Sequence, residues 1–143
     1  MAKNTTSNTA GAKGATVRWL EAPVKHDYPA AGSYLRLLAD PAVVEAVTRA
    51  LAEAPTVVQH AKDVLRAAGL PLLPPDDPEV AKDLKRAAKG VRLSPILLGR
   101  GDVPSGRGVV IADGYHRVCA SYHLDENTEI PCRIVDLPTA VHA

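Results

Sequence analysis

Residues 111–123 read Ile-Ala-Asp-Gly-Tyr-His-Arg-Val-Cys-Ala-Ser-Tyr-His and continue the apolar run Val109-Val110-Ile111. The run predicts a buried strand, the small turn Ala112-Asp113-Gly114 predicts its end, and the residues that follow fit a helix over 115–124. Backbone N–H groups in the first turn of such a helix have no partner within the helix, and they attract anions. This stretch therefore predicts a strand-to-helix turn that could hold a phosphate.

Further strands are expected on both sides of this turn. Residues 93–98 are apolar, residues 99–108 are rich in turn formers, and residues 109–111 are apolar again, a pattern that predicts a β-hairpin with a long tip. Residues 130–135 predict a final strand. Pro131 lies near its start, where one backbone donor can be missing.

The N-terminal half predicts one strand followed by helices. Residues 17–21 alternate in polarity and favour a short strand, and Pro23 and Pro29 are expected to bracket a loop after it. Asp40-Pro41 has the pattern of a helix start, and Thr56 and Gln59 have the spacing of a capping box. The expected helices cover 33–39, 41–54, 56–69 and 77–90, with a proline-rich extended crossing over 70–76.

The order of a strand, a helical insert, a hairpin, a helix and a strand predicts an α/β or α+β fold with a small mixed sheet. At 143 residues the chain has the length of one domain. Residues 1–15 are polar and have almost nothing to bury, so we expect a disordered tail there. Residues 16–143 are expected to form the domain, with the helical insert at about 30–75.

The charge balance argues against a partner that is attracted by the overall charge of the protein. Lys and Arg total 17 and Asp and Glu total 16, for a formal net charge of +1, so no global positive field marks a nucleic-acid or membrane-surface protein. Arg100 and Arg107, on the expected hairpin tip, could still contact nucleic acid locally. No apolar run reaches the roughly 18 residues needed to span a bilayer, so no membrane association is expected.

The sequence contains two cysteines, Cys119 and Cys132. Two cysteines cannot build the disulfide framework of a secreted mini-protein, although one bridge between them stays formally open. We therefore expect reduced thiols and a cytoplasmic location. Helical spacing places Cys119 with Tyr115, Val118 and Tyr122 on the face expected to pack on the sheet, so we interpret it as a core thiol.

Three residues of the opening stretch form a candidate phosphate cradle. Gly114 lets the backbone approach a ligand, Arg117 offers a fork of donors suited to phosphate, and His116 lies between them. Plainer interpretations stay open, because His116 and Arg117 can be surface residues and Asp113 can be a helix cap. No metal site is predicted, since His116 and His123 are two helical turns apart, about 10 Å along the axis.

The pentad Asp113-Gly114-Tyr115-His116-Arg117, placed between a strand and a helix, resembles the motif that holds nucleotide phosphates in the ParB/sulfiredoxin-like superfamily. The run Leu93-Ser94-Pro95-Ile96-Leu97 and the later Ile130-Pro131 strand are also similar to that superfamily. The resemblance covers residues 77–137. It implies the superfamily's α/β fold, here with a helical insert after the first strand.

Branches of this superfamily differ at the motif. Sulfiredoxins carry a nucleophilic cysteine where this chain has Tyr115, which argues against reduction of a sulfinic acid. ParB proteins carry a Glu-Arg-Arg box and a further DNA-binding domain. Members similar to free serine kinases carry Asp-Gly-His-His-Arg, from which this chain differs at Tyr115. The resemblance therefore implies a nucleotide-dependent phosphotransferase or hydrolase.

For such an enzyme, the resemblance implies roles for the five motif residues. Asp113 would accept the proton of a substrate hydroxyl. Gly114, Tyr115, His116 and Arg117 would bind the phosphates of ATP, ADP or CTP, with a magnesium ion sharing the charge. The ligand would be a nucleotide or another phosphorylated small molecule.

Phosphoryl transfer also requires a second acid from elsewhere in the chain. Glu21, at the end of the first strand, and Asp27, in the loop that follows, are candidates by topology, although either can be an ordinary surface charge. Residues 25–36 gather polar and aromatic groups that could close over the phosphate site as a lid. The plainer interpretation is a helical embellishment that completes the core.

A different class of function stays open beside the enzyme. The chain could be a non-catalytic module that uses the same pocket as a nucleotide-gated switch, or that binds protein or DNA. A second acid close to Asp113 would favour the enzyme, and an interface covering His116 would favour the module. A homodimer is compatible with either class.

Overall fold

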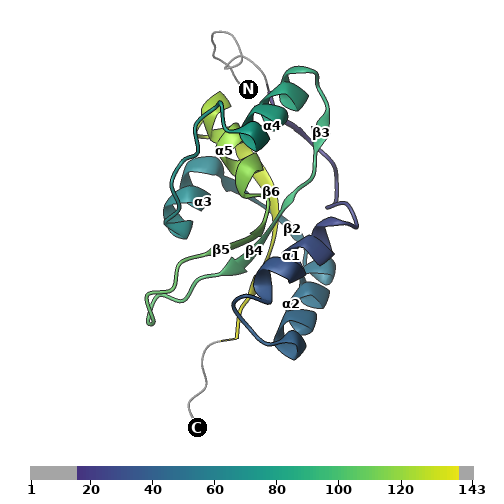
Figure 1. Cartoon of the computed structure of the whole chain (residues 1–143), viewed down its shortest axis with the longest axis vertical. Coiled ribbons are helices and arrows are strands. Elements are labelled where there is room, and N and C mark those ends of the chain that lie inside the picture. Colours follow the sequence, from purple (N-terminus) through teal and green to yellow (C-terminus); the bar gives the residue numbers. More distant parts are fainter. Residues whose placement is uncertain (1–15, 139–143) are drawn as a thin grey trace.

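The computed structural model describes residues 16–138, and this part of the chain is mixed α and β (Figure 1). Its strands form a four-stranded sheet of order β2-β6-β4-β5 and a separate two-stranded sheet, β1-β3. The predicted fold class, a small mixed sheet with helices, is therefore confirmed. The tail predicted over 1–15 lies outside the described residues.

The elements have the following bounds. The strands are β1 (Arg18–Trp19), β2 (Thr56–His60), β3 (Arg92–Leu93), β4 (Ile96–Arg100), β5 (Val110–Asp113) and β6 (Glu129–Asp136). The helices are α1 (Asp27–Leu35), α2 (Pro41–Glu53), α3 (Ala61–Ala68), α4 (Pro78–Ala88) and α5 (Tyr115–Leu124). Within residues 16–138, none of these helices is long and apolar enough to cross a membrane.

The four-stranded sheet is built around β6, which lies between β2 and β4. β4 and β5 pair antiparallel and form the predicted hairpin, and β6 confirms the predicted final strand. β6 runs parallel to β4 and antiparallel to β2. β5 returns the chain to the end of the sheet where β4 begins, and α5 then carries it past β4 to β6, so β6 runs parallel to β4.

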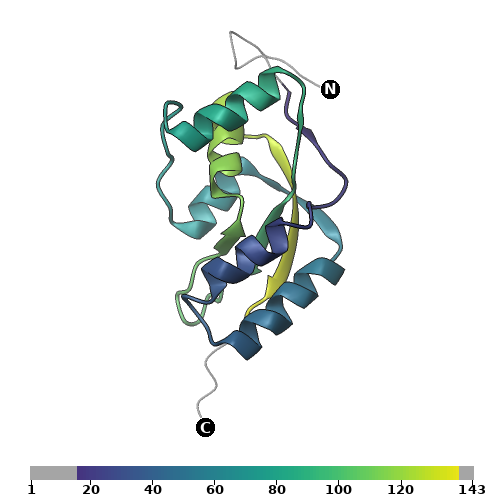
Figure 2. The ribbon, with the colours of Figure 1, turned by 45° about the vertical axis from the view of Figure 1, so that its right-hand side comes forward.

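Helices cover both faces of the sheet (Figures 1 and 2). Ile96 and Leu98 of β4 pack into a cluster with residues of α3, α4 and α5, whereas Leu97 packs into a second cluster with residues of α1 and α2. Successive side chains of a strand point to opposite faces, which is why neighbours in β4 belong to different clusters. Burial on two faces accounts for the unbroken apolar run that predicted this strand.

The helix predicted over 56–69 is wrong in its first part. Thr56–His60 forms strand β2, and the helix, α3, covers only Ala61–Ala68. Thr56, Val57 and Val58 are β-branched and suit a strand, and pairing with β6 satisfies backbone groups that a helix would otherwise satisfy. The insert over 30–75 therefore contributes an edge strand to the sheet as well as helices.

The helix predicted over 33–39 begins earlier, and α1 covers Asp27–Leu35. Pro29 is the third residue of α1, where a missing N–H is harmless because first-turn donors have no helical acceptor. The two prolines therefore do not bracket a loop, and Asp27 is the first residue of a helix. The first strand, predicted over 17–21, is confirmed as Arg18–Trp19, which pairs parallel with β3.

Two helix starts that the sequence indicated are confirmed. The carboxylate of Asp40 accepts a hydrogen bond from the N–H of Val43 at 3.1 Å, and that of Asp77 accepts one from the N–H of Val80 at 3.1 Å. In each case a proline follows the cap at the first helical position. These local signals need no tertiary contact, which explains why they are readable from the sequence.

Packing of α2 on the sheet can be tested with a matched pair of leucines. Leu51 of α2 is 0% exposed and Leu37, after α1, is 81% exposed. Leu51→Ala should lower the free energy of unfolding by about 2–5 kcal/mol, because it removes buried methyl groups and leaves a cavity. Leu37→Ala should change it by less than about 0.5 kcal/mol. Urea denaturation followed by circular dichroism measures both, and equal effects would contradict the described packing.

Candidate functional site

The turn between β5 and α5 requires a glycine at position 114. Gly114 has φ 112° and ψ 14°, a left-handed conformation that residues with side chains rarely adopt. A Cβ here would lie 2.5 Å from Cγ2 of Ile96 and 2.9 Å from Nη2 of Arg117. No side chain of the described residues caps α5, so its first-turn N–H groups remain available to a ligand or to water.

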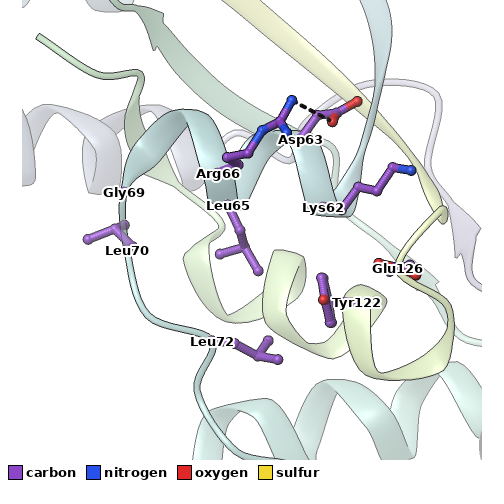
Figure 3. A pocket seen from close by; sticks show the side chains of 9 residues that line it. All are labelled: Lys62, Asp63, Leu65, Arg66, Gly69, Leu70, Leu72, Tyr122 and Glu126. Carbon is purple, nitrogen blue, oxygen red and sulfur yellow. Dashed lines mark ion pairs between the residues drawn. The ribbon is translucent and has the colours of Figure 1, made fainter. Parts of the chain in front are cut away.

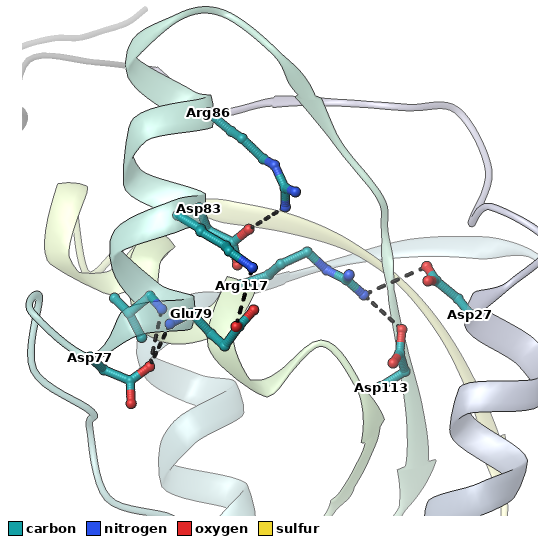
Figure 4. A network of polar contacts seen from close by, with 9 residues as sticks. Asp27, Asp77, Glu79, Asp83, Arg86, Asp113 and Arg117 are labelled. Carbon is teal, nitrogen blue, oxygen red and sulfur yellow. Dashed lines mark hydrogen bonds and ion pairs between the residues drawn. The ribbon is translucent and has the colours of Figure 1, made fainter.

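Arg117, in the first turn of α5, forms ion pairs with two carboxylates (Figure 4). Its Nη2 atom lies 2.9 Å from Oδ2 of Asp113, at the end of β5, and 3.7 Å from Oδ2 of Asp27, the first residue of α1. The Arg117 side chain is 17% exposed and that of Asp27 is 5% exposed, so this cluster is largely shielded from water. The N-termini of α1 and α5 therefore approach each other at this point.

A serine from the segment between β3 and β4 orients Asp27. The Ser94 hydroxyl donates a hydrogen bond to Oδ2 of Asp27 at 2.5 Å and accepts one from the N–H of Val24 at 3.1 Å. Asp27 and Ser94 are both buried. These contacts hold the carboxylate in place, so its distance from Arg117 does not depend on a freely rotating side chain.

A third carboxylate, Asp83 of α4, lies close enough to Arg117 for the two charges to interact, and it pairs with Arg86 (Figure 4). Asp83 is buried, and its Oδ1 accepts a hydrogen bond from Nη1 of Arg86 at 3.1 Å. The sequence analysis missed both Asp83 and Ser94. A signal for Asp83 was present, because it lies one helical turn from Val80 and from Ala87 and so falls on the apolar stripe of α4.

Burial raises the pKa of two of these carboxyl groups, those of Asp113 and Asp83. It raises the pKa of Asp113 above the usual 3.8; Arg117 opposes this rise, and the negative charge of Asp27 adds to it. Burial likewise raises the pKa of Asp83, and Arg117 and then Arg86 oppose that rise. The positive charge of Arg117 therefore favours the ionised forms of Asp113 and Asp83.

The structure brings together most, but not all, of the residues that the sequence analysis selected. Asp113, Gly114 and Arg117 meet Asp27 at the turn, and His116 lies partly exposed beside them. Glu21 is exposed and has no hydrogen bond or ion pair to this cluster among residues 16–138. Of the two candidates for a second acid, Asp27 is therefore the one that lies at the turn.

Tyr115 contacts a different part of the molecule. Its hydroxyl donates a hydrogen bond to the carbonyl of Pro71 at 2.6 Å, and Nε2 of His123 lies 2.7 Å from the carbonyl of Leu73. These contacts hold the proline-rich crossing over 70–76 against α5. The Tyr115 side chain thus has a structural role, and its contribution to the turn is its backbone N–H.

The arginines considered for nucleic-acid binding are engaged by neighbouring groups. Nε of Arg100 donates to Oδ1 of Asp136 at 2.7 Å, and Nη2 of Arg107 lies 3.5 Å from the carbonyl of Arg100. The side chains of Arg100 and Asp136 are both exposed, so water screens this pair. Neither arginine contacts the cluster around Arg117 within residues 16–138.

A cavity of about 590 Å³ lies between α3, the start of the proline-rich crossing and α5 (Figure 3). Its charged lining residues balance one another, since Lys62 and Arg66 are opposed by Asp63 and Glu126. Arg66 and Asp63 also pair with each other at 4.0 Å. The formal charges of the lining therefore cancel, and none of the residues at the turn lines this cavity.

No family model, curated protein or solved structure matches this chain.

The electrostatic arrangement around Asp113 can be tested by titration. The carboxyl of Asp113 should titrate above 3.8 in the wild type. Asp27→Asn should lower its pKa, because a neighbouring negative charge is removed, and Arg117→Gln should raise it, because the cation is removed. Carbon-detected NMR of the side-chain carboxyl measures each value.

A control variant, Glu45→Gln, alters an exposed carboxyl of α2 whose partner is Arg49. It should leave the pKa of Asp113 unchanged. A wild-type pKa at or below 3.8, or no response to Asp27→Asn, would contradict the geometry described here.

Proposed function

We propose that this protein binds a phosphorylated small molecule, with a nucleotide as the leading class, at the turn over 113–117 and acts on its phosphate. The observation that carries this proposal is the N-terminus of α5, which no side chain caps. Gly114 brings this N-terminus close to the guanidinium group of Arg117, which is largely shielded from water. Free backbone N–H groups and a guanidinium group are the donors that bind phosphate oxygens most favourably.

The position of α1 strengthens the case for an anion. Asp27 is the first residue of α1 and lies 3.7 Å from Arg117 in the first turn of α5, so two helix N-termini converge. Each N-terminus carries a partial positive charge of about half an elementary charge. The positive potentials of the two N-termini add at the turn. Because the turn is shielded from water, the solvent screens them only weakly.

The carboxylates at the turn imply that a cation accompanies the phosphate. Asp27 and Asp113 together outweigh the charge of Arg117 and would repel a phosphate that arrived alone. The carboxylate of Asp27 is a ligand that Mg²⁺ accepts, usually together with substrate phosphates, and this leaves Asp113 free to accept a proton. Among residues 16–138, no group of three or more His, Cys, Asp or Glu side chains could hold a metal ion without such help. Magnesium would therefore bind with the nucleotide.

Asp113 is the candidate proton acceptor. Its raised pKa makes the carboxylate a stronger base than an exposed aspartate. Asp113 would take the proton of an acceptor hydroxyl while the acceptor oxygen bonds to the terminal phosphorus, and the leaving oxygen of the nucleotide would keep the electrons of the broken bond. With water as the acceptor, the same step is hydrolysis. The proximity of Asp27 to Asp113 favours such an enzyme.

Membership of the ParB/sulfiredoxin-like superfamily is part of this proposal. It is supported by the placement of Asp113-Gly114-Tyr115-His116-Arg117 between a strand and a helix. A cytoplasmic location is also part of it. Cys119 and Cys132 are both buried and unbridged, which suits a reducing compartment.

A second candidate, a nucleotide-gated switch, is favoured by one observation. Arg117 pairs with Asp27, and α1, which begins at Asp27, packs against the edge strand β5. A phosphate that paired with the guanidinium group of Arg117 would displace Asp27 from it. The loss of this ion pair would weaken the attachment of α1 to the rest of the protein. In this case nucleotide binding would move α1 without turnover.

Binding is tested by calorimetry with ATP, ADP and CTP, each with magnesium. Arg117→Gln should weaken binding by about tenfold or more, because a charge-assisted hydrogen bond contributes about 1.5–3 kcal/mol. Arg66→Gln is the matched control, since the Arg66 side chain is 87% exposed on α3, and it should leave binding unchanged. His116→Ala should weaken binding without breaking the ion pairs of Arg117, so it covers the case in which Arg117→Gln unfolds.

Turnover separates the enzyme from the switch. Asp113→Asn should retain nucleotide binding but lower the rate of phosphate release or transfer by about a hundredfold or more, because it removes the proton acceptor. Phosphate release is followed by a coupled assay across a panel of hydroxyl acceptors, with water as the reference. Binding without turnover would favour the switch over the enzyme. If none of the three nucleotides bound, both candidate functions would be overturned.

A further inference from the structure

Strand β2 forms an open edge of the four-stranded sheet. It pairs with β6 on one side, and on its other side no described strand is bonded to it. The opposite edge is different, because α1 packs against β5. β2 has no comparable cover: four of its five residues are exposed, and Val57 and Val58 are 36% and 53% exposed.

The register of β2 against β6 determines which backbone groups face outward. Opposite residues of an antiparallel pair alternate between hydrogen-bonded and non-hydrogen-bonded positions. Ala61 lies one position beyond β2, and its N–H donates to the carbonyl of Thr128 at 2.9 Å, which makes that pair a hydrogen-bonded one. Because the two kinds of position alternate along the ladder, Val58, three residues before Ala61, and its partner Pro131 occupy a non-hydrogen-bonded position.

Pro131 supports this assignment independently, because it has no N–H to give to Val58. The N–H and C=O groups of Val58 therefore point away from β6, toward the open edge, and those of Thr56 do the same. The described residues provide no hydrogen-bond partner for these groups.

The chemistry of this edge lacks the usual protection against pairing. Exposed edge strands normally carry a lysine, a proline or an inward charge that blocks a second strand. Thr-Val-Val-Gln-His, over Thr56–His60, has no formally charged residue at neutral pH and no proline. β-branched residues at its first three positions favour the extended conformation that pairing requires.

We infer that β2 pairs antiparallel with β2 of a second copy of this chain, about a twofold axis at Val58. In this register Val58 donates to and accepts from Val58 of the second copy, and each His60 N–H donates to the Thr56 carbonyl of the other. The two four-stranded sheets become one continuous sheet. The inference does not depend on the proposed nucleotide site.

A second copy suits this edge better than an unrelated strand. The outward-facing residues are the first, third and fifth of β2, so the strand is symmetric about Val58 and pairs with itself over its whole length. No like charges meet in this register, because Thr56 lies opposite His60 and Val57 opposite Gln59. The exposed Val58, beside Pro131 on the same face, meets its equivalent and covers apolar surface. A twofold pair is closed, so it yields a dimer and no fibre.

The test is the molar mass of the full chain, measured by light scattering after size exclusion over a concentration series. The wild type should approach twice the 15.1 kDa of one chain. Val58→Lys should raise the dimer dissociation constant by about tenfold or more, because it places two lysines opposite each other at the axis. Val103→Lys is the matched control at a 93% exposed valine of the hairpin tip and should leave the dimer unchanged.

Val58→Thr, which keeps the β-branched shape, should also preserve the dimer, and circular dichroism shows whether each variant is folded. A monomer at every concentration would overturn the inference. So would a dimer that folded Val58→Lys leaves intact, since the interface would then lie elsewhere. Hydrogen exchange that shows a protected Val58 amide in a monomer would assign the edge to a segment of the same chain, which also overturns it.

Discussion

The ion pairs of Arg117 join the two helical layers of this protein around one edge of its sheet. α5 packs in the cluster on one face and α1 in the cluster on the other, and Arg117 links them through Asp27. Removing one partner of a buried pair commonly costs about 3–5 kcal/mol, because the remaining charge has lost its hydration without gaining a counter-ion. Gly114 makes the link geometrically possible, because any Cβ there would collide with Ile96.

The same link gives the turn its chemical character. A guanidinium group that pairs with both Asp27 and Asp113 is held in place by its surroundings before any ligand arrives. Preorganised charges of this kind bind a ligand or a transition state without first reorganising. Under the proposed function, stability and ligand binding are coupled at this turn, because Arg117 also pairs with Asp27 of α1. A phosphate bound there would compete with groups that hold α1 in place.

The two proposals concern opposite edges of one sheet. The proposed nucleotide site follows β5, and the proposed twofold axis lies at β2, with β6 and β4 between them. Pairing through β2 would therefore leave the turn open in each copy. Strand β6 connects the two features, because its register with β2 determines which groups of β2 face outward and because it also pairs with β4.

Local patterns in the sequence determined α5, the hairpin of β4 and β5, and the caps at Asp40 and Asp77, since neighbouring residues supply the bonds that make these elements. They also placed Asp113, Gly114 and Arg117 at one strand-to-helix turn. Only the tertiary structure decided that 56–60 is a strand, because its pairing partner lies some seventy residues away in β6. It also selected Asp27 over Glu21 and added Asp83 and Ser94, since burial and charge depend on which distant segments meet.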